Sequence, residues 1–297
     1  MTHQIDEREV AVAGGMLATF RFGPPGERAP SVLAVHGITG SSYAWLPLAR
    51  ALNGRATTFA PDLRGRGASG GLPGPYGIAA HVADLIAVLD QLELARPTVV
   101  VGHSLGAYIV ARLAADHPDR IRAAVLVDGG LTIPGTDQVE PQAFLDAFLG
   151  PALARLKMTF ASREAYRDWW RAHPAMQGGD VADADLAAYA DHDLVGAPSK
   201  LRSCVAERAV RGDAADLFEM GAAAHRLTVP ATLVCAPRGL LDEPNPMQPL
   251  ALVREWAAGA PQQRRALQVR GVNHYTIAMG HAGASELAEV VAAALSR

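Results

Sequence analysis

Short apolar runs that alternate with helical patterns constrain the fold of this 297-residue chain more than any other feature. Runs that end near Gly37, Asp62, Ser104 and Asp128 are nearly continuous in apolar side chains, which is typical of strands buried in a parallel sheet. Between these runs, residues 78–92 and 106–117 repeat apolar side chains at helical spacing. The alternation of strand and helix predicts an α/β fold with a mostly parallel, doubly wound sheet.

The pattern also predicts how the chain is divided. Residues 7–22 alternate polar and apolar side chains around two glycines, which favours an opening hairpin. From about residue 131 to residue 228 the sequence is rich in helical patterns and contains no convincing strand, whereas strand patterns resume beyond it. We therefore expect one α/β core, residues 1–130 and 229–297, that is interrupted by a helical insertion at residues 131–228.

Composition excludes several classes of function. The formal net charge of −3 offers no strong positive field for nucleic acid or for an anionic membrane surface. Cys204 and Cys235 have no spacing that suggests zinc, so we interpret both as small buried side chains. The first residues are acidic where a secretory signal would be basic, and no run approaches the roughly 18 apolar residues of a membrane span. A cytoplasmic location is expected.

The pattern G-x-S-x-G occurs twice, around Ser69 and around Ser104. A nucleophilic serine in this pattern needs a strand that leads into a sharp turn and a helix that follows it, so that the hydroxyl is held outward. Ser104 has both, whereas Ser69 lies in a loop rich in Gly and Pro and is interpreted as a turn residue. The local sequence fits a helix-capping serine equally well. The choice between a nucleophile and a cap therefore depends on whether the chain supplies a histidine and a carboxylate that could activate the hydroxyl.

The most direct partner is a histidine. A serine hydroxyl becomes a good nucleophile when an imidazole takes its proton and a carboxylate orients that imidazole. Of the 10 histidines, His274 directly follows the last predicted strand, and His281 further along the same loop is its rival. His36 and His103 come too early in the chain order that this fold uses, so we interpret them as structural neighbours of the site.

Carboxylates at two strand ends compete for the role of the acid. Asp242, with Glu243 beside it, follows the strand near Leu233 and is preferred. Asp128 ends an earlier strand and is the alternative, because carboxylates at different strand ends can reach one histidine from different sides.

Attack on a carbonyl also creates an oxyanion, which two backbone N–H groups in a dry pocket stabilise. Leu105 offers one N–H at the start of a helix, where N–H groups are free and the dipole favours negative charge. Ile38, in the loop VHGITG, offers the second, and Gly37 permits the tight turn there.

Together, the motifs VHGITG, DLRGRGASG, VGHSLG, GLLD and NHYT, in this order and at these separations, resemble the α/β-hydrolase fold family. The resemblance covers nearly the whole chain apart from residues 131–228, where members of that family carry a variable lid. It implies a catalytic triad of Ser104, Asp242 and His274, oxyanion donors at Ile38 and Leu105, and neither a cofactor nor a metal. The serine at the nucleophile position departs from the haloalkane dehalogenase and epoxide hydrolase branches, which use aspartate there.

Aromatic side chains in the predicted lid suggest a substrate class. Tyr166, Trp169, Trp170 and His173 recur at the spacing of one helix face. Turned towards the catalytic edge, this face would form an apolar pocket for a bulky acyl group or ring system; alternatively, the rings fasten the lid to the core. His173 is expected at the surface. Few cationic residues interrupt the face, so a free carboxylate or phosphate on the substrate is not indicated.

Three functional hypotheses follow. The leading one is a serine hydrolase that cleaves a small apolar carboxylic ester or lactone through an acyl-enzyme. A second hypothesis keeps the triad but cleaves a carbon–carbon bond beside a ketone, since a fold alone does not separate the two reactions. The third is a ligand-binding, receptor-like protein that retains the triad with little turnover. No feature of the sequence specifies an oligomeric state.

Overall fold

The computed structural model describes residues 4–23, 29–92, 94, 97–135, 141–218 and 221–296, and describes the backbone alone at 141–145, 147–148 and 217–218. Within these residues, eight strands form one sheet in the order β1-β2-β4-β3-β5-β6-β9-β10. The strands are β1 (Gln4–Val12), β2 (Gly15–Gly23), β3 (Ser31–Val35), β4 (Thr57–Pro61), β5 (Thr98–His103), β6 (Ile121–Val127), β9 (Ala231–Cys235) and β10 (Arg264–Gln268). The β1/β2 hairpin and the β2/β4 pair are antiparallel, and the other neighbours are parallel. The predicted fold class is confirmed.

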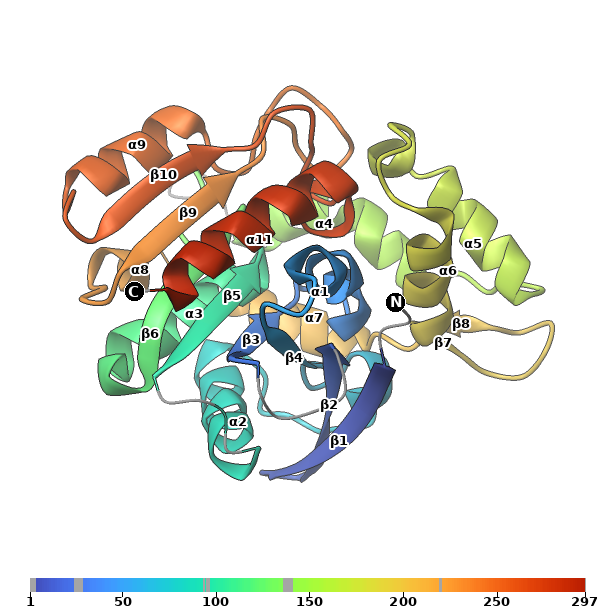
Figure 1. Ribbon diagram of the computed structural model, residues 1–297. Helices are drawn as coiled ribbons and strands as arrows, with labels where there is room; N and C mark the ends of the chain where they lie inside the picture. Colours follow the sequence, from blue (N-terminus) through green and yellow to red (C-terminus); the bar gives the residue numbers. More distant parts are fainter. Residues whose placement is uncertain are drawn as a thin grey trace.

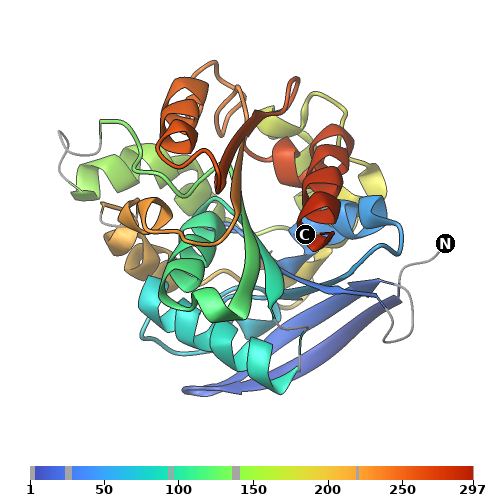
Figure 2. The same cartoon turned by 60° about the vertical axis from the view of Figure 1, so that its left-hand side comes forward.

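Helices cover both faces of this sheet (Figures 1 and 2). One face carries α1 (Leu46–Leu52), α10 (Thr276–Met279) and α11 (His281–Leu295), and the other carries α2 (Ile78–Gln91), α3 (Leu105–Asp116) and α9 (Leu250–Ala258). Short 3-10 turns are η1 (Ser42–Trp45), η2 (Gly67–Ser69) and η3 (Pro118–Arg120). Because both faces are covered, the central strands can be apolar on both sides: all six residues of β5 are buried.

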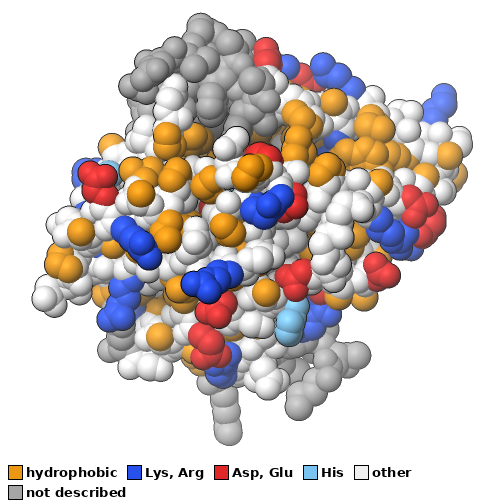
Figure 3. Space-filling view, turned by 90° about the horizontal axis from the view of Figure 1, so that it is seen from above, with side chains coloured by type: hydrophobic (Ala, Val, Ile, Leu, Met, Phe, Trp, Pro, Cys, Tyr) orange, Lys and Arg blue, Asp and Glu red, His pale blue; other side chains and the backbone are white. Residues whose placement is uncertain are grey.

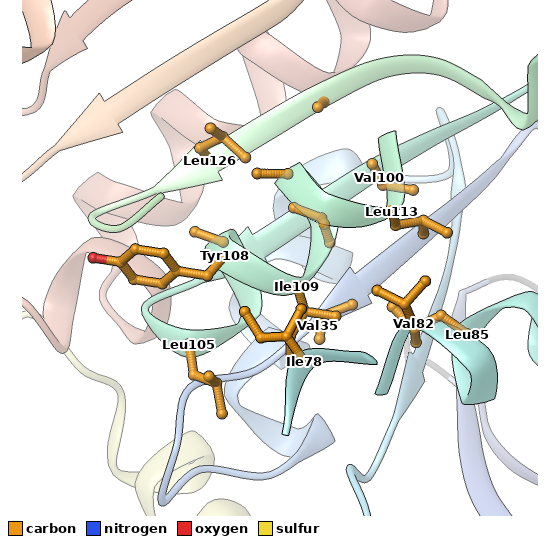
Figure 4. Packing of buried hydrophobic residues seen from close by; sticks show 14 of the residues in the cluster. Val35, Ile78, Val82, Leu85, Val100, Leu105, Tyr108, Ile109, Leu113 and Leu126 are labelled. Carbon is orange, nitrogen blue, oxygen red and sulfur yellow. The ribbon is translucent and has the colours of Figure 1, made fainter. Parts of the chain in front are cut away.

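Packing around α3 fixes the turn that carries Ser104. Its buried face, with Leu105, Tyr108 and Ile109, lies against Val35 of β3 and Val100 of β5 (Figure 4). Side chains of α2 close this layer from the far side. Burying side chains of this size contributes roughly 1.5–3 kcal/mol each, so the start of α3 is held firmly against the sheet.

An insertion separates β6 from β9 (Figure 1). It contains α4 (Pro141–Leu156), α5 (Arg163–Arg171), η5 (Pro174–Met176), α6 (Asp183–His192), β7 (Leu194–Val195), β8 (Arg202–Ser203), α7 (Glu207–Ala214), η6 (Ala215–Phe218) and α8 (Ala222–His225). The predominance of helix agrees with the sequence pattern. The β7/β8 pair was not predicted, because two residues per strand are too few for a periodic signal.

The face seen from above carries charges of both signs interspersed with apolar side chains (Figure 3). Among the helices that the structure describes, none is both long enough and apolar enough to cross a membrane.

Candidate active site

Ser104 occupies a strained turn between β5 and α3. Its backbone angles, φ 54° and ψ −120°, are unfavourable for an L-residue, and its N–H donates to the Val127 carbonyl on the neighbouring strand at 3.0 Å. An added Cβ at Gly106 would lie 2.1 Å from the Val35 carbonyl oxygen, so the turn requires glycine there. Ser104 is partly exposed although its neighbours are buried, so the turn presents its side chain at the carboxyl end of the sheet.

His274 lies in the loop between β10 and α10 and contacts Asp128. Its Nδ1 and the Asp128 Oδ2 are 2.7 Å apart, and both side chains are buried. Because the carboxylate can only accept, Nδ1 carries the proton and Nε2 keeps its lone pair. Asp128 directly follows β6 and its other oxygen accepts from the Ala236 N–H at 3.1 Å, which fixes the carboxylate between two strand ends.

Asp242, which the sequence pattern favours as the acid, makes different contacts. Its Oδ1 accepts from Arg238 Nε at 2.7 Å and from Asn273 Nδ2 at 3.1 Å, and its side chain is 39% exposed. The Arg238 hydrogen bond holds the pKa of Asp242 below its ordinary value. The loop after β9 carries Asp242 seven residues beyond the strand end, and out into solvent. Glu243 accepts from the Leu241 N–H within the same loop at 2.7 Å. The structure therefore brings Asp128, and neither of these residues, to His274.

His103 and Gly239 hold the backbone of His274. The His103 Nε2–H donates to the His274 carbonyl at 2.8 Å, and the His274 N–H donates to the Gly239 carbonyl at 3.3 Å. Burial and the neighbouring His274 ring hold the pKa of His103 well below its ordinary value, so His103 stays neutral. This contact agrees with its interpretation as a structural neighbour.

The loop after β3 passes close to Ser104: an added Cβ at Gly37 would lie 3.2 Å from the Ser104 Cβ. His36 Nδ1 lies 2.8 Å from the Gly37 carbonyl, and its Nε2 accepts from the Leu63 N–H at 3.0 Å. These contacts assign the proton to Nδ1. In a trans peptide the C=O and N–H point in opposite directions, so the bond to the Gly37 carbonyl turns the Ile38 N–H away from His36.

The two predicted oxyanion donors come from two segments next to Ser104. Leu105 begins α3, and Ile38 lies in the loop that follows β3, the strand next to β5. Among the described residues, the N–H groups of Ile38 and Leu105 donate to no acceptor. Both remain available to a bound anion.

One cavity joins these groups. Ser104 and His274 both line it, together with Gly37, Ile38 and apolar side chains that include Ala44, Leu149, Leu240 and Met279. Its volume is about 40 Å³, which fits a small group. Tyr275 and Tyr189 also line it. The sequence patterns missed both, although Tyr275 directly follows His274 and adjacency was a usable signal.

A second cavity of about 260 Å³, here called the outer cavity, shares the lining residues Ala152 and Tyr275 with the first. Trp169, Trp170 and His173 line the outer cavity. Tyr166, the third predicted pocket residue, lines neither described cavity; it is fully buried within the insertion. His173 is partly buried rather than a surface residue, and burial followed by the Arg155 charge lowers its pKa to about 4.

The rival residues have other roles. Ser69 Oγ accepts from the Ala18 N–H at 2.9 Å, which agrees with its interpretation as a turn residue. His281 begins α11 and lines another cavity, which shares the lining residue Met279 with the cavity beside Ser104. Within the described part of the chain, no group of three or more His, Cys, Asp or Glu side chains is arranged to hold a metal ion.

A comparison with known families decides where this chain belongs. A model described as the alpha/beta hydrolase fold matches residues 30–193, more than half of the chain. The chain belongs to the α/β-hydrolase family. The resemblance seen in the sequence motifs is thus confirmed at the level of the family.

Individual members of the family match this chain either over part of its length or at low sequence identity. Lipase LipV of Mycobacterium tuberculosis is 35% identical over 182 residues, which cover 60% of this chain and 62% of the lipase. The chain therefore spans less than two thirds of the length of that curated relative. Among solved structures, E-2-(acetamidomethylene)succinate hydrolase has a TM-score of 0.78 at 22% identity, covering 99% of this chain and 100% of that one. The enol-lactonase of Burkholderia xenovorans has a TM-score of 0.65 at 23% identity, covering 98% and 100%. At such identities these two structures show the shared fold alone.

Proposed function

We propose that this α/β-hydrolase is a serine hydrolase that cleaves a carboxylic ester or lactone of an apolar substrate through an acyl-enzyme. The observation that carries the proposal is the 2.7 Å hydrogen bond between His274 and the buried Asp128, beside a cavity that His274 shares with Ser104. A buried carboxylate that orients an imidazole next to a strained serine is the arrangement that activates a hydroxyl.

The proton follows a short path in this mechanism. His274 Nε2 takes the proton from Ser104 Oγ as the oxygen attacks the carbonyl, and Asp128 stabilises the imidazolium without taking a proton itself. The imidazolium then protonates the leaving alcohol, and the acyl group stays on Ser104. Water, activated by the same imidazole, releases the acid and restores the serine.

The developing oxyanion is stabilised by the N–H groups of Ile38 and Leu105. Both belong to buried residues, and both lack an internal acceptor within the described residues. The positive end of α3 adds to the attraction at Leu105. Because the cavity is lined mainly by apolar side chains, these donors act in a dry environment where hydrogen bonds to charge are strongest.

The two cavities favour a substrate of two unequal parts. The 40 Å³ beside Ser104 fits a small acyl or alkoxy group, and the 260 Å³ beyond it fits a ring or chain. Trp169, Trp170 and Tyr275 offer flat apolar surface to that larger part. The insertion, which contributes both tryptophans, would thus act as the lid.

A fluorophosphonate probe tests the activated serine. We expect the wild type to be labelled and Ser104→Ala to be unlabelled, with Ser69→Ala labelled as well as the wild type. Absence of labelling in the folded wild type would contradict the proposal and favour a binding protein.

The products of turnover test the class of bond. We expect release of alcohol and acid from an aryl ester that carries a small acyl group, and no cleavage of a vinylogous diketone. Cleavage of the diketone, lost in Ser104→Ala, would instead assign the triad to carbon–carbon bond hydrolysis.

A further inference from the structure

The loop that carries Ile38 is held by its carbonyl groups. The Gly37 carbonyl contacts His36 Nδ1 at 2.8 Å, the Ile38 carbonyl accepts from Arg66 Nε at 2.9 Å, and the Thr39 carbonyl accepts from Arg155 Nη2 at 3.2 Å. Three consecutive carbonyls of a segment without regular structure therefore have buried side-chain donors. Two of the donors are guanidinium groups, which are planar and bind in fixed directions.

The two arginines approach the loop from different parts of the molecule. Arg66 belongs to the core, in the loop after β4, and its Nη2 pairs with Asp213 of α7 at 2.6 Å. Arg155 belongs to α4 of the insertion. Its exposed fraction is 2%, so its contact with Thr39 is shielded from water.

The other partners of Arg155 lie within the insertion. It pairs with Asp193, contacts the Tyr166 hydroxyl, and lies 3.4 Å from Ser203 Oγ. Its guanidinium carbon lies 5.1 Å from the centre of the Trp170 ring, a cation–π contact. Tyr166 and Trp170 belong to α5, Asp193 directly follows α6, and Ser203 belongs to β8. Asp193 balances the charge of Arg155, whose side chain also lines the outer cavity.

Position, rather than charge, is what Arg155 can contribute to the site. The Thr39 peptide follows Ile38 directly, and rotation of one peptide plane changes the direction of its neighbours. A misplacement of about 1 Å in a catalytic group can cost about a hundredfold in rate. A donor that fixes Thr39 thus restricts the direction of the Ile38 N–H.

We propose that Arg155 is a positioning residue that holds the oxyanion loop through the Thr39 carbonyl, so that the insertion sets the geometry of the oxyanion hole. The proposal rests on the proposed serine hydrolase function. It gives the insertion a role in the chemical step besides that of covering the substrate.

A purely structural role is the competing explanation. Removing Arg155 leaves Asp193 buried without its cation, which by itself destabilises a protein. The informative variant is therefore Arg155→Met/Asp193→Asn, which removes both charges and the Thr39 contact together. Arg167→Met is the matched control, because Arg167 pairs with Asp191 and Glu164 on the outside of the insertion.

The experiment compares the melting temperature, kcat and KM for the aryl ester, and inhibition by an arylboronic acid, which forms a tetrahedral adduct on the serine. For the double variant we expect a melting temperature closer to the wild type than that of Arg155→Met. We also expect a kcat at least about tenfold lower and boronate inhibition weakened to a similar extent, whereas KM, which reports on the outer cavity that Arg155 also lines, should change less than kcat. Arg167→Met should match the wild type in all of these.

Recovery of kcat together with melting temperature in the double variant would overturn the proposal. If that variant does not fold, Arg155→Lys replaces it, since lysine keeps the charge beside Asp193 but not the fork that also reaches Thr39; a wild-type kcat in Arg155→Lys would equally overturn it. Failure of the proposed function gives a different result: the fluorophosphonate would then not label the wild type, or it would label Ser104→Ala as strongly as the wild type.

Discussion

Asp128 and Asp242 follow neighbouring strands, and their surroundings differ. Asp128 is buried and shared between His274 and the Ala236 N–H, whereas Asp242 is partly exposed and bound to Arg238. Burial strengthens the attraction between a carboxylate and an imidazolium, because water no longer screens it. The role of the orienting acid therefore belongs to Asp128 in the mechanism proposed above.

Substitution of each acid separates these roles. We expect Asp128→Asn to lower kcat by roughly 10³–10⁴-fold, because an amide at this position favours the wrong tautomer of His274. Asp242→Asn should change kcat by less than about threefold. Steady-state hydrolysis of the aryl ester measures both, and the reverse ranking would return the role to Asp242.

His36 makes stability depend on pH. Burial lowers its pKa from the ordinary 6.5 to about 4, so between these values the unfolded chain binds a proton that the folded chain refuses. The contribution of neutral His36 to the free energy of unfolding is therefore fully present above pH 6.5 and is lost as the pH drops towards 4. Burial alone would raise the pKa of Asp62 and of Asp213. However, His192 lowers the pKa of Asp62 and Arg66 lowers that of Asp213, and each pKa ends below its ordinary value. These two acids therefore lose their stabilising contribution only at a pH below this window.

Urea unfolding at pH 7 and pH 5 measures this effect. For His36→Gln we expect the loss of unfolding free energy between the two pH values to be smaller than in the wild type by on the order of 2 kcal/mol. His225→Gln, at an exposed position, is the control. Equal losses in the wild type and His36→Gln would contradict the assignment of a buried neutral imidazole.

At the scale of elements, the β5–α3 turn depends on close backbone approach. A Cβ at Gly106 would lie 2.1 Å from the Val35 carbonyl oxygen, whereas nothing lies within 4 Å of a Cβ at Gly71. We expect Gly106→Ala to lower the unfolding free energy by more than about 2 kcal/mol and to impair fluorophosphonate labelling. Gly71→Ala, in the decoy motif, should alter neither. Wild-type stability of Gly106→Ala would show that the turn relaxes.

Helix α5 uses neighbouring tryptophans differently. Trp170 is 1% exposed and packs in the interior of the insertion, while Trp169 is only partly buried. We expect Trp170→Ala to cost roughly 3–5 kcal/mol in unfolding free energy. Trp169→Ala should cost less but raise KM for esters with a large ring. Equal stability losses, with KM unchanged in Trp169→Ala, would assign both rings to packing alone.

At the scale of the molecule, buried polar contacts join the insertion to the core. His192 Nε2 lies 2.6 Å from Asp62, Arg66 pairs with Asp213 at 2.6 Å, and Asn273 donates to the Ala175 carbonyl at 2.9 Å. Separating the two parts would leave these groups without partners, which is costly for buried charges. The insertion and the core should therefore unfold together.

Tryptophan fluorescence tests this cooperativity. In Trp45→Phe/Trp256→Phe the remaining tryptophans, Trp169 and Trp170, lie in the insertion and report on it alone. We expect their urea transition to coincide with that of the helical circular dichroism signal. A fluorescence transition at lower urea would show that the insertion opens independently.

The sequence by itself determined the order of strands and helices, the family, and the elements that carry Ser104 and His274. These features depend on local periodicity and on the geometry of a parallel sheet, in which the residues that directly follow the strands lie at the same edge. The glycines around Ser104 belong to this class as well, because the strained turn needs them wherever it occurs.

Only the tertiary structure brought Asp128, rather than Asp242, to His274, and only it placed Arg66 and Arg155 against the loop that carries Ile38 and Thr39. Which carboxylate reaches His274 depends on the path of the loop after β9, which carries Asp242. The local sequence pattern, a carboxylate that follows a strand, is the same for Asp128 and for Asp242. The hydrogen bond from Arg155 to the Thr39 carbonyl joins two residues that are 116 positions apart in the chain. Such contacts are set by the packing of whole elements, which no short stretch of sequence encodes.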